Sequence, residues 1–238
     1  MALRLDKYLT EMGIGSRSEV KQGIRKGFAR VNGETAVRPE FKVDERDRVT
    51  WKGTPVDFVA YEYIMLNKPA GVVSATEDKR DRTVLDLVKD ARRKDLFPVG
   101  RLDKDTEGLL LLTNDGKLAH RLLSPKHHVA KVYYARVQGV MTEADVQRFK
   151  QGFAVDDELT ALPAELEILS VCEGDTCEIR LKIFEGKFHQ VKRMVQAAGK
   201  EVLYLKRLSM GPLVLDAALA PGEYRSLTEK EQEALYAE

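Results

Sequence analysis

The group in this sequence best suited to chemistry is a carboxylate in a short polar loop. Asp103 stands two residues after Arg101 and shortly before four consecutive leucines at 109–112. A continuous apolar run predicts a strand buried on both faces, and the Asn-Asp-Gly that follows predicts a turn. A polar loop anchored on such a strand can hold a nucleophile or a general acid or base. The simpler interpretation is that Asp103 only turns the chain before the strand.

Three other segments carry residues that could act together with this aspartate. Lys68 lies in the sequence Asn-Lys-Pro-Ala-Gly after an expected strand, and Tyr133 lies in Lys-Val-Tyr-Tyr where another strand begins. Residues 185–194, Glu-Gly-Lys-Phe-His-Gln-Val-Lys-Arg-Met, end a strand and start a helix. That segment lacks the glycine spacing of a phosphate-binding loop. We interpret His189 within it as a polar helix start.

In this order the four segments resemble the pseudouridine synthases, specifically the RsuA family, which modifies small-subunit ribosomal RNA. The resemblance covers the whole chain. It implies that Asp103 is the essential aspartate, that Tyr133 stacks against the target base, and that Leu205 packs near the site. It also implies that Lys187 pairs with the aspartate and keeps it ionised. Many members carry arginine at that position, and a lysine supplies a point charge without the planar pair of donors.

The resemblance also implies the reaction. The bond between a uracil nitrogen and its ribose breaks, the ring turns over, and carbon 5 bonds to the same sugar. There is no net transfer or redox change, so we expect no cofactor and no metal. Asp103 can attack the sugar, attack the ring or remove a sugar proton, and these routes stay open. The uridine must first be flipped out of folded RNA. The side chains expected to bind it and the distorted strand are Arg101, Leu205, Lys68, Lys104, Lys192 and Arg193.

The N-terminal segment carries a local excess of positive charge. Its first thirty residues hold seven basic and three acidic side chains, whereas the whole chain has a net charge of +1. Most charge runs are solvated helix faces, but a basic cluster at one end of a neutral chain indicates docking to a polyanion. Two short helices, the second with a capping box at 16–19, and a small hairpin resemble the RNA-binding domain named after ribosomal protein S-four. The residues expected to dock ribosomal RNA are Arg4, Lys7, Arg17, Lys21, Arg25 and Lys26.

The elements expected around these segments give an α+β fold with a mixed, mostly antiparallel sheet. We expect an RNA-binding domain at 1–58, a linker at 53–57 and the catalytic domain at 59–238. A turn at 173–176, between the two cysteines, predicts a hairpin. The expected strands of the catalytic domain are 63–66, 109–113, 132–139, 164–172, 177–184 and 202–206. The expected helices are 83–93, 116–123, 142–151 and 187–198.

Composition places the chain among ordinary globular proteins. It is 43% hydrophobic and 32% charged, without a run of residues as long as a membrane span. The first residues do not read as a secretory signal, so we expect a cytoplasmic protein. We also expect a monomer. Two cysteines without further ligands nearby predict free thiols rather than a zinc site.

Two alternatives compete with an enzyme acting on small-subunit RNA. The first keeps the reaction and changes the target to large-subunit RNA. Relatives with that target often carry long basic C-terminal extensions, whereas this chain ends soon after Leu227 in Glu-Lys-Glu-Gln-Glu. The second is a ribosome assembly factor that binds RNA without catalysis. The intact set Asp103, Tyr133 and Lys187 argues against it, because a pure binder needs no buried carboxylate–cation pair.

Overall fold

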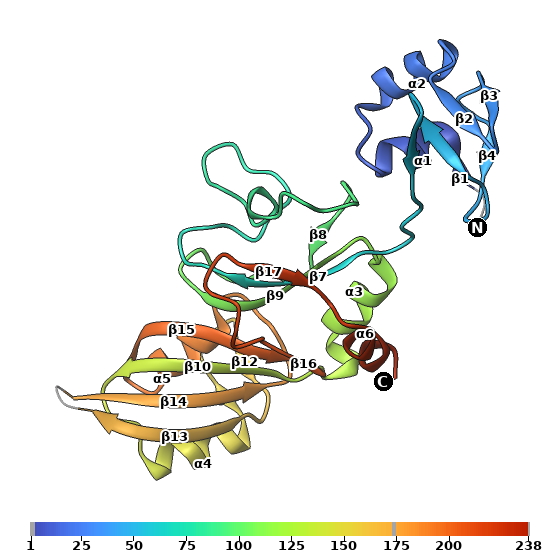
Figure 1. The fold of residues 1–238 in the computed structure, drawn as a ribbon. Coiled ribbons are helices and arrows are strands. Elements are labelled where there is room, and N and C mark those ends of the chain that lie inside the picture. Colours follow the sequence, from blue (N-terminus) through green and yellow to red (C-terminus); the bar gives the residue numbers. More distant parts are fainter. Residues whose placement is uncertain (1–2, 173–174, 238) are drawn as a thin grey trace. The chain divides into compact units, whose positions relative to one another are not determined.

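The computed structural model describes residues 3–172 and 175–237. The chain divides into two compact units (Figure 1). The first unit runs to Glu62 and also includes Lys89–Leu96, and the second contains Tyr63–Val88 and the chain from Phe97 onward. The sequence predicts a boundary between residues 58 and 59. In the structure the first unit extends slightly further and takes a second segment from the middle of the chain.

The first unit packs two helices against small sheets. Helix α1 (Leu5–Glu11) is followed by α2 (Arg17–Arg25), and Ser16 and Glu19 form the predicted capping box. One sheet has the order β3-β2-β5-β6, and β1 pairs with β4. These strands are β1 (Leu3–Arg4), β2 (Ala29–Val31), β3 (Glu34–Ala36), β4 (Lys42–Val43), β5 (Val49–Trp51) and β6 (Thr54–Val56).

The linker predicted at 53–57 is wrong, because most of that segment is strand β6. Lys52 and Gly53 have φ values of 49° and 84°, as a two-residue hairpin turn with the twist of its flanking strands requires. The turn folds β6 back onto β5 in an antiparallel pair. The segment therefore completes the sheet of the first unit.

The helix predicted over 83–93 is also wrong. Only a single turn of 3-10 helix, η1 (Leu85–Leu87), forms there. The buried guanidinium of Arg93 donates to Glu11 and to Asp95, each at 2.8 Å. The backbone N–H of Arg93 donates to the carboxylate of Glu62 at 2.7 Å. These contacts hold the segment in the first unit, and tertiary context overrides its local helix propensity.

The second unit is built on a nine-stranded mixed sheet, which confirms the predicted fold class. Its main path is β13-β14-β10-β15-β9-β7-β17, with β16 on β15 and β8 on β9. Only the β9–β15 pair is parallel among the described strands. The strands are β7 (Tyr63–Lys68), β8 (Phe97–Pro98), β9 (Glu107–Thr113), β10 (Lys131–Gln138), β13 (Glu165–Cys172), β14 (Thr176–Ile183), β15 (Glu201–Met210), β16 (Leu213–Val214) and β17 (Tyr224–Ser226).

The predicted hairpin is formed by β13 and β14, which pair in antiparallel register. Glu173 and Gly174 of its predicted turn lie outside the described residues. Cys177, at the start of β14, is a buried free thiol. A separate two-stranded sheet joins β11 (Phe153–Ala154) to β12 (Thr160–Ala161).

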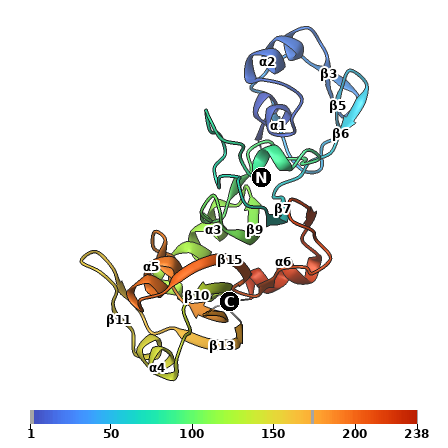
Figure 2. The same cartoon turned by 90° about the vertical axis from the view of Figure 1, so that its left-hand side faces the viewer.

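Helices cover parts of this sheet. Helix α4 packs against β13, and α5 packs against β15 (Figure 2). The helices are α3 (Gly116–Leu123), α4 (Glu143–Gln151), α5 (Gln190–Ala197) and α6 (Glu229–Tyr236), with a 3-10 turn η2 (Pro125–His127). The sequence interpretation missed α6, although Thr228 and Glu231 form a capping box at its start. It also began α5 three residues too early, and this shift affects the site below.

Strand β9 is the rigid support of the Asp103 loop. The side chains of residues 109–112 are fully buried, as the four-leucine run predicts. Gly108 precedes them with φ of 101°, and a Cβ atom there would lie 2.2 Å from the carbonyl oxygen of Arg207 on β15. Only glycine allows this close approach of the two parallel strands. The loop before β9 is thereby held against the end of β15.

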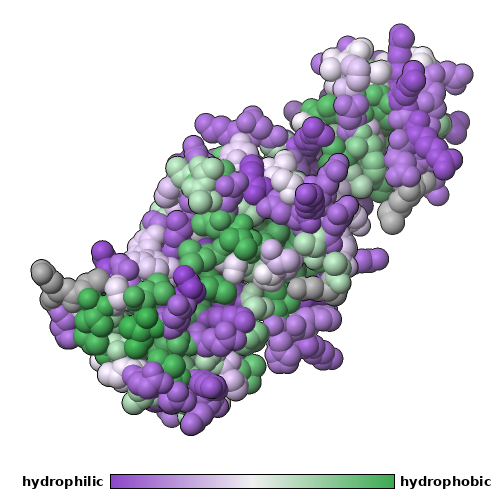
Figure 3. Space-filling model, turned by 60° about the horizontal axis from the view of Figure 1, so that its bottom comes forward, coloured by the Kyte–Doolittle hydropathy of each residue, from purple (hydrophilic) through white to green (hydrophobic). Residues whose placement is uncertain are grey.

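The surface is mixed in polarity. The face in Figure 3 shows polar side chains interspersed with apolar areas. Across the described part of the chain, every helix is too short or too polar to traverse a lipid bilayer.

Candidate active site

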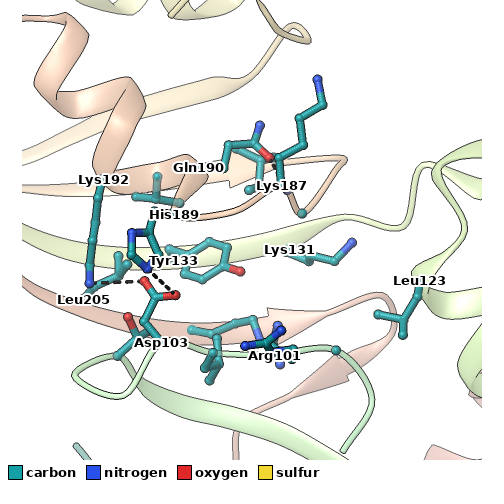
Figure 4. A pocket seen from close by; sticks show the side chains of 17 residues that line it. Arg101, Asp103, Leu123, Lys131, Tyr133, Lys187, His189, Gln190, Lys192 and Leu205 are labelled. Atoms are coloured by element: carbon teal, nitrogen blue, oxygen red, sulfur yellow. Dashed lines mark hydrogen bonds and ion pairs between the residues drawn. The ribbon is translucent and has the colours of Figure 1, made fainter. Parts of the chain in front are cut away.

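A cavity of about 90 Å³ surrounds the predicted aspartate. Most of its lining comes from four segments: the loop at 100–106, the start of β10, the middle of β15, and the chain from 186 to 192 (Figure 4). These segments are far apart in the sequence. The β-sheet brings three of them together, and α5 brings the fourth.

Two basic side chains of the fourth segment contact Asp103. The ammonium of Lys192 lies 3.1 Å from Oδ2, and Nε2 of His189 lies 3.5 Å from Oδ1. Lys192 also donates to Asp105 at 2.6 Å. Burial would lower the pKa of Lys192, but its hydrogen bonds to Asp105 and Asp103 outweigh burial and raise it. Lys192 is therefore a positive charge fixed at the carboxylate.

Asp103 and Asp105, which lies two residues later in the same loop, differ in exposure. The side chain of Asp103 is 25% exposed and lines the cavity, whereas that of Asp105 is 73% exposed and does not. Lys192, which donates a hydrogen bond to Asp105, lowers the pKa of that carboxyl group. Of the two carboxylates, only Asp103 faces the enclosed space in which a base could bind.

The predicted pairing of Lys187 with Asp103 is wrong. The Lys187 ammonium donates to the carbonyl of Thr160 at 2.8 Å and lies 3.2 Å from the carboxylate of Glu185. Figure 4 shows this side chain directed away from Asp103. Glu185 is buried, and a buried carboxylate requires a charged or hydrogen-bonding partner. Lys187 lines the cavity, but its charge is used by Glu185.

The start of α5 explains this change of partner. His189 is the N-cap residue and has a left-handed backbone with φ of 49°. Residues before it are not helical, and Lys192 is in the first helical turn. Its side chain points to Asp103, whereas that of Arg193 is rotated about 100° around the helix. Arg193 donates to Asp156 at 2.7 Å and does not line the cavity, so it is not placed beside Asp103, and its predicted contact with the distorted RNA strand stays a prediction.

Tyr133 and Leu205 come from neighbouring strands. Tyr133 of β10 pairs with Arg207 of β15, and Ala135 pairs with Leu205. A register shift lies between Val132 and Tyr133, and such a bulge re-aims the side chains next to it. The side chains of Tyr133 and Leu205 are both buried and both line the cavity. They provide an aromatic and an apolar wall beside Asp103.

Tyr134, the neighbour of Tyr133 on β10, does not line the cavity. Its ring packs edge to face on Tyr204, with the ring centroids 6.0 Å apart. Successive residues of a strand point to opposite faces, so Tyr133 alone of the pair reaches the cavity.

Lys68 holds the loop that carries Asp103 and does not line the cavity, which corrects its predicted role in binding substrate. It is fully buried. Its ammonium donates to the carbonyls of Pro69 and Asp103 at 3.0 Å, Thr106 at 2.8 Å and Lys104 at 3.3 Å. Burial lowers the pKa of Lys68 to about 8. Three of the four acceptors belong to the loop that carries Asp103, so one cation fixes that backbone.

The variant Lys68→Met is expected to lower the free energy of unfolding by about 2–3 kcal/mol at pH 7.5, because buried carbonyls lose their donor. The difference in free energy of unfolding between the wild type and Lys68→Met should widen as the pH rises. The folded protein releases this proton near pH 8, whereas an unfolded chain releases it near pH 10.4. Between these values the unfolded chain binds more protons, so the stability of the wild type increases with pH. Relative to the variant, the gain between pH 8 and 9.5 is about 2 kcal/mol.

Urea unfolding of both proteins at pH 7.5 and 9.5 measures this effect. Equal pH dependence in the two proteins would show that Lys68 does not titrate in this range. Lys104→Met is the matched control, because that ammonium is exposed and bonds only to Asp81 at 2.6 Å.

The remaining residues predicted to bind the substrate RNA differ in their position relative to the cavity. Arg101 lines the cavity and is exposed at its rim. Lys104 lies outside the cavity and pairs with Asp81 at the surface, so its predicted contact with the distorted RNA strand stays a prediction. The cavity residues that the sequence interpretation missed include two buried cations, Lys131 and Arg207. Lys131 is two residues from Tyr133 on β10, and Arg207 is two residues from Leu205 on β15. Residues two apart on a strand share a face, and this spacing is the signal that could have indicated them.

The six residues predicted to dock RNA fall into two groups, those that form ion pairs within the first unit and those that do not. Arg4 and Lys21 lie 3.0 Å and 3.9 Å from the carboxylate of Asp6, and Lys7 lies 3.5 Å from Glu11. The remaining three are exposed and form no ion pair with any residue that the structure describes; they are Arg17, Arg25 and Lys26. This second set is the positive charge available to a ligand.

The cavity offers no set of metal ligands. Within residues 3–172 and 175–237, no group of three or more His, Cys, Asp or Glu side chains could hold a metal ion. The chemistry that the site offers is that of a carboxylate held by a cation beside an aromatic ring.

Comparison with known families decides what kind of protein carries this site. Residues 62–197 match the family described as RNA pseudouridylate synthase. This chain belongs to that family. Residues 3–49 match the S4 domain, so the synthase carries an S4 domain at its N-terminus. The predicted family and enzyme class, an isomerase of the pseudouridine synthase type, are confirmed.

Individual relatives match nearly the full synthase chain. An uncharacterized RNA pseudouridine synthase, YtzG of Bacillus subtilis, is 51% identical over 96% of both chains. The ribosomal small subunit pseudouridine synthase A of Vibrio parahaemolyticus is 40% identical over 98% of this chain and 100% of its own. A crystal structure of a pseudouridylate synthase matches with a TM-score of 0.68 and 36% identity, covering 98% of this chain and 99% of the other.

Proposed function

We propose that this synthase converts one uridine of small-subunit (16S) ribosomal RNA to pseudouridine, as a cytoplasmic monomer without cofactor or metal. Relatives about 40% identical over nearly the whole length bear the name ribosomal small subunit pseudouridine synthase A. The observation that carries the proposal is the Asp103 carboxylate, held 3.1 Å from the ammonium of Lys192 in a cavity with Tyr133. Such a group can act on a sugar or a base without help from a bound metal.

The side chains of the cavity divide the chemical work. Asp103 is the nucleophile or base that acts on the ribose or the ring. Lys192 orients it and places a positive charge beside it, and His189 contacts the second oxygen. Tyr133 stacks on the uracil ring, and Leu205 closes the opposite side. Together these walls retain the detached ring while it turns over, since water and free diffusion would otherwise remove it.

The substrate uridine reaches this cavity by base flipping. The carboxylate is only partly exposed, and a base stacked in an RNA helix cannot approach it. Arg101 at the rim is placed to contact the phosphates of the distorted strand. On the first unit, Arg17, Arg25 and Lys26 supply charge for docking to RNA, in keeping with its S4 domain.

Pseudouridine mapping tests the proposed target. Ribosomal RNA from cells with and without the gene is compared at single-nucleotide resolution. We expect one pseudouridine of the small-subunit RNA to disappear on deletion and to return when the gene is restored. Loss of a large-subunit pseudouridine instead would replace the proposed target, and an unchanged map would contradict ribosomal RNA as the substrate.

A further inference from the structure

Arg207 is a buried cation with little compensation from the protein. It is 2% exposed, and its Nε donates to the carbonyl of Leu109 at 2.8 Å. Its Nη2 is buried and has no hydrogen-bond partner within residues 3–172 and 175–237. No carboxylate forms an ion pair with it among the residues that the structure describes. Burying a charge without a partner costs several kcal/mol, so this guanidinium requires an explanation beyond stability.

A second buried cation lies near it. Lys131 is 6% exposed, and among the described residues its ammonium donates to a single acceptor, the carbonyl of Val129, at 2.9 Å. Burial, followed by the positive charge of Arg207, lowers the pKa of Lys131 to about 8. At neutral pH both side chains are still mainly charged. Their mutual repulsion indicates a site built to receive negative charge.

Both cations line the same cavity as the catalytic aspartate. Arg207 is directly opposite Tyr133 in the β10–β15 register, and Lys131 is two residues before Tyr133 on the same face. Thr106, also in the cavity lining, is buried with an unpartnered hydroxyl oxygen. Three polar groups thus lack full partners on the buried side of the space beside the stacking ring.

We propose that Arg207, assisted by Lys131, binds the uracil ring and stabilises the negative charge that the ring carries after the glycosidic bond breaks. This inference rests on the proposed function. When the bond from N1 to C1′ breaks, its electron pair stays on the base. The uracil becomes a monoanion with charge spread over N1, O2 and O4. The sugar carbon gains either a bond to an Asp103 oxygen or a double bond after loss of the C2′ proton to that carboxylate.

The charge is neutralised when the new bond has formed. Carbon 5 of the uracil anion bonds to C1′. In the first route this releases the Asp103 oxygen from C1′. In the second route C2′ takes back its proton from the Asp103 carboxyl group. The proton at C5 is then lost, and N1 gains one, so atoms and charges balance. Both routes pass through a free uracil anion, and direct attack of Asp103 on the ring does not. Donors preorganised for such an anion act strongly in a water-poor site.

The alternative ligand for these cations is a backbone phosphate. Their position argues against it, because Arg207 and Lys131 are almost fully buried, whereas Arg101 at the rim is exposed. A flipped nucleotide enters base first, which leaves its phosphates near the rim. The ring is the part of the substrate that reaches the depth of Arg207.

The test uses total ribosomal RNA labelled with 5-tritiated uridine, taken from cells that lack the gene. Each isomerisation releases the tritium at C5 to water. With enzyme in excess over RNA, Arg207→Met should lower the rate about a hundredfold, because one anion-stabilising group is lost. RNA affinity measured by filter binding should stay unchanged. Arg207→Lys should lose less, and added guanidinium ion should partly restore Arg207→Ala. Should Arg207→Met not fold, the last two variants decide.

Arg180→Met is the matched control, because that arginine is exposed on β14 and bonds to Glu167 at the surface; its rate should equal that of the wild type. Weaker RNA binding with an unchanged rate at saturating enzyme would overturn the inference in favour of a phosphate contact. Equal losses in all three Arg207 variants without guanidinium rescue would overturn it in favour of a structural role. Tritium release from large-subunit RNA would refute the proposed target alone, since the same variants still decide the role of Arg207.

Discussion

Asp103→Asn is expected to abolish pseudouridine formation, lowering the rate by at least about 10⁴-fold, because an amide can neither attack the sugar nor accept its proton. The amide keeps the size of the carboxylate and can still accept from Lys192. The cavity, the loop at 100–106 and its support by Lys68 should therefore persist. Tritium release from labelled ribosomal RNA measures the rate, and filter binding measures the affinity, which should remain close to that of the wild type.

Asp105→Asn is the matched comparison for this prediction. Asp105 lies in the same loop and bonds to the same lysine at 2.6 Å, but it is exposed outside the cavity. Its replacement should cost less than about tenfold, as expected for an exposed ion pair. A reversed order of the two variants would identify Asp105 as the reactive carboxylate. An Asp103→Asn enzyme with undiminished yield would exclude the catalytic assignment and leave an RNA-binding assembly factor.

Lys192→Met is expected to lower the rate about a thousandfold, since Asp103 would lose the cation that orients it in a partly buried site. Lys187→Met should cost less than about tenfold, because that ammonium serves Glu185 and the carbonyl of Thr160. The two lysines are five residues apart in one segment, so they are close controls for each other. Single-turnover rates and RNA affinities of both variants decide between them.

A larger loss in Lys187→Met than in Lys192→Met would restore the pairing that the sequence predicts and contradict the arrangement described above. Lys192→Arg provides a further check, because it keeps the charge. Its rate should lie between those of the wild type and Lys192→Met. If Lys192→Arg were as slow as Lys192→Met, charge alone would not explain the contribution of this residue.

Local patterns predicted much of the second unit correctly. The leucine run at 109–112 is fully buried, and the helices expected at 116–123 and 142–151 are α3 and α4. These elements have strong periodicity or caps of their own. The predicted helix over 83–93 failed because Arg93 is held by Glu11, Asp95 and Glu62. Glu11 and Glu62 lie far from Arg93 in the chain, and no local pattern in the segment encodes those two contacts.

The functional residues divide in the same way. The sequence by itself determined the family, the reactive carboxylate as a candidate and the neighbouring aromatic, because their motifs are contiguous. Only the tertiary structure decided which lysine faces the aspartate, since a shift of three residues at the start of α5 changes which side chains point inward. It also turned Lys68 from an expected substrate contact into the support of a loop. The pairing of β10 with β15 placed Arg207 opposite Tyr133 on the neighbouring strand. Motifs record which groups are present, whereas burial and direction arise only when distant segments pack together.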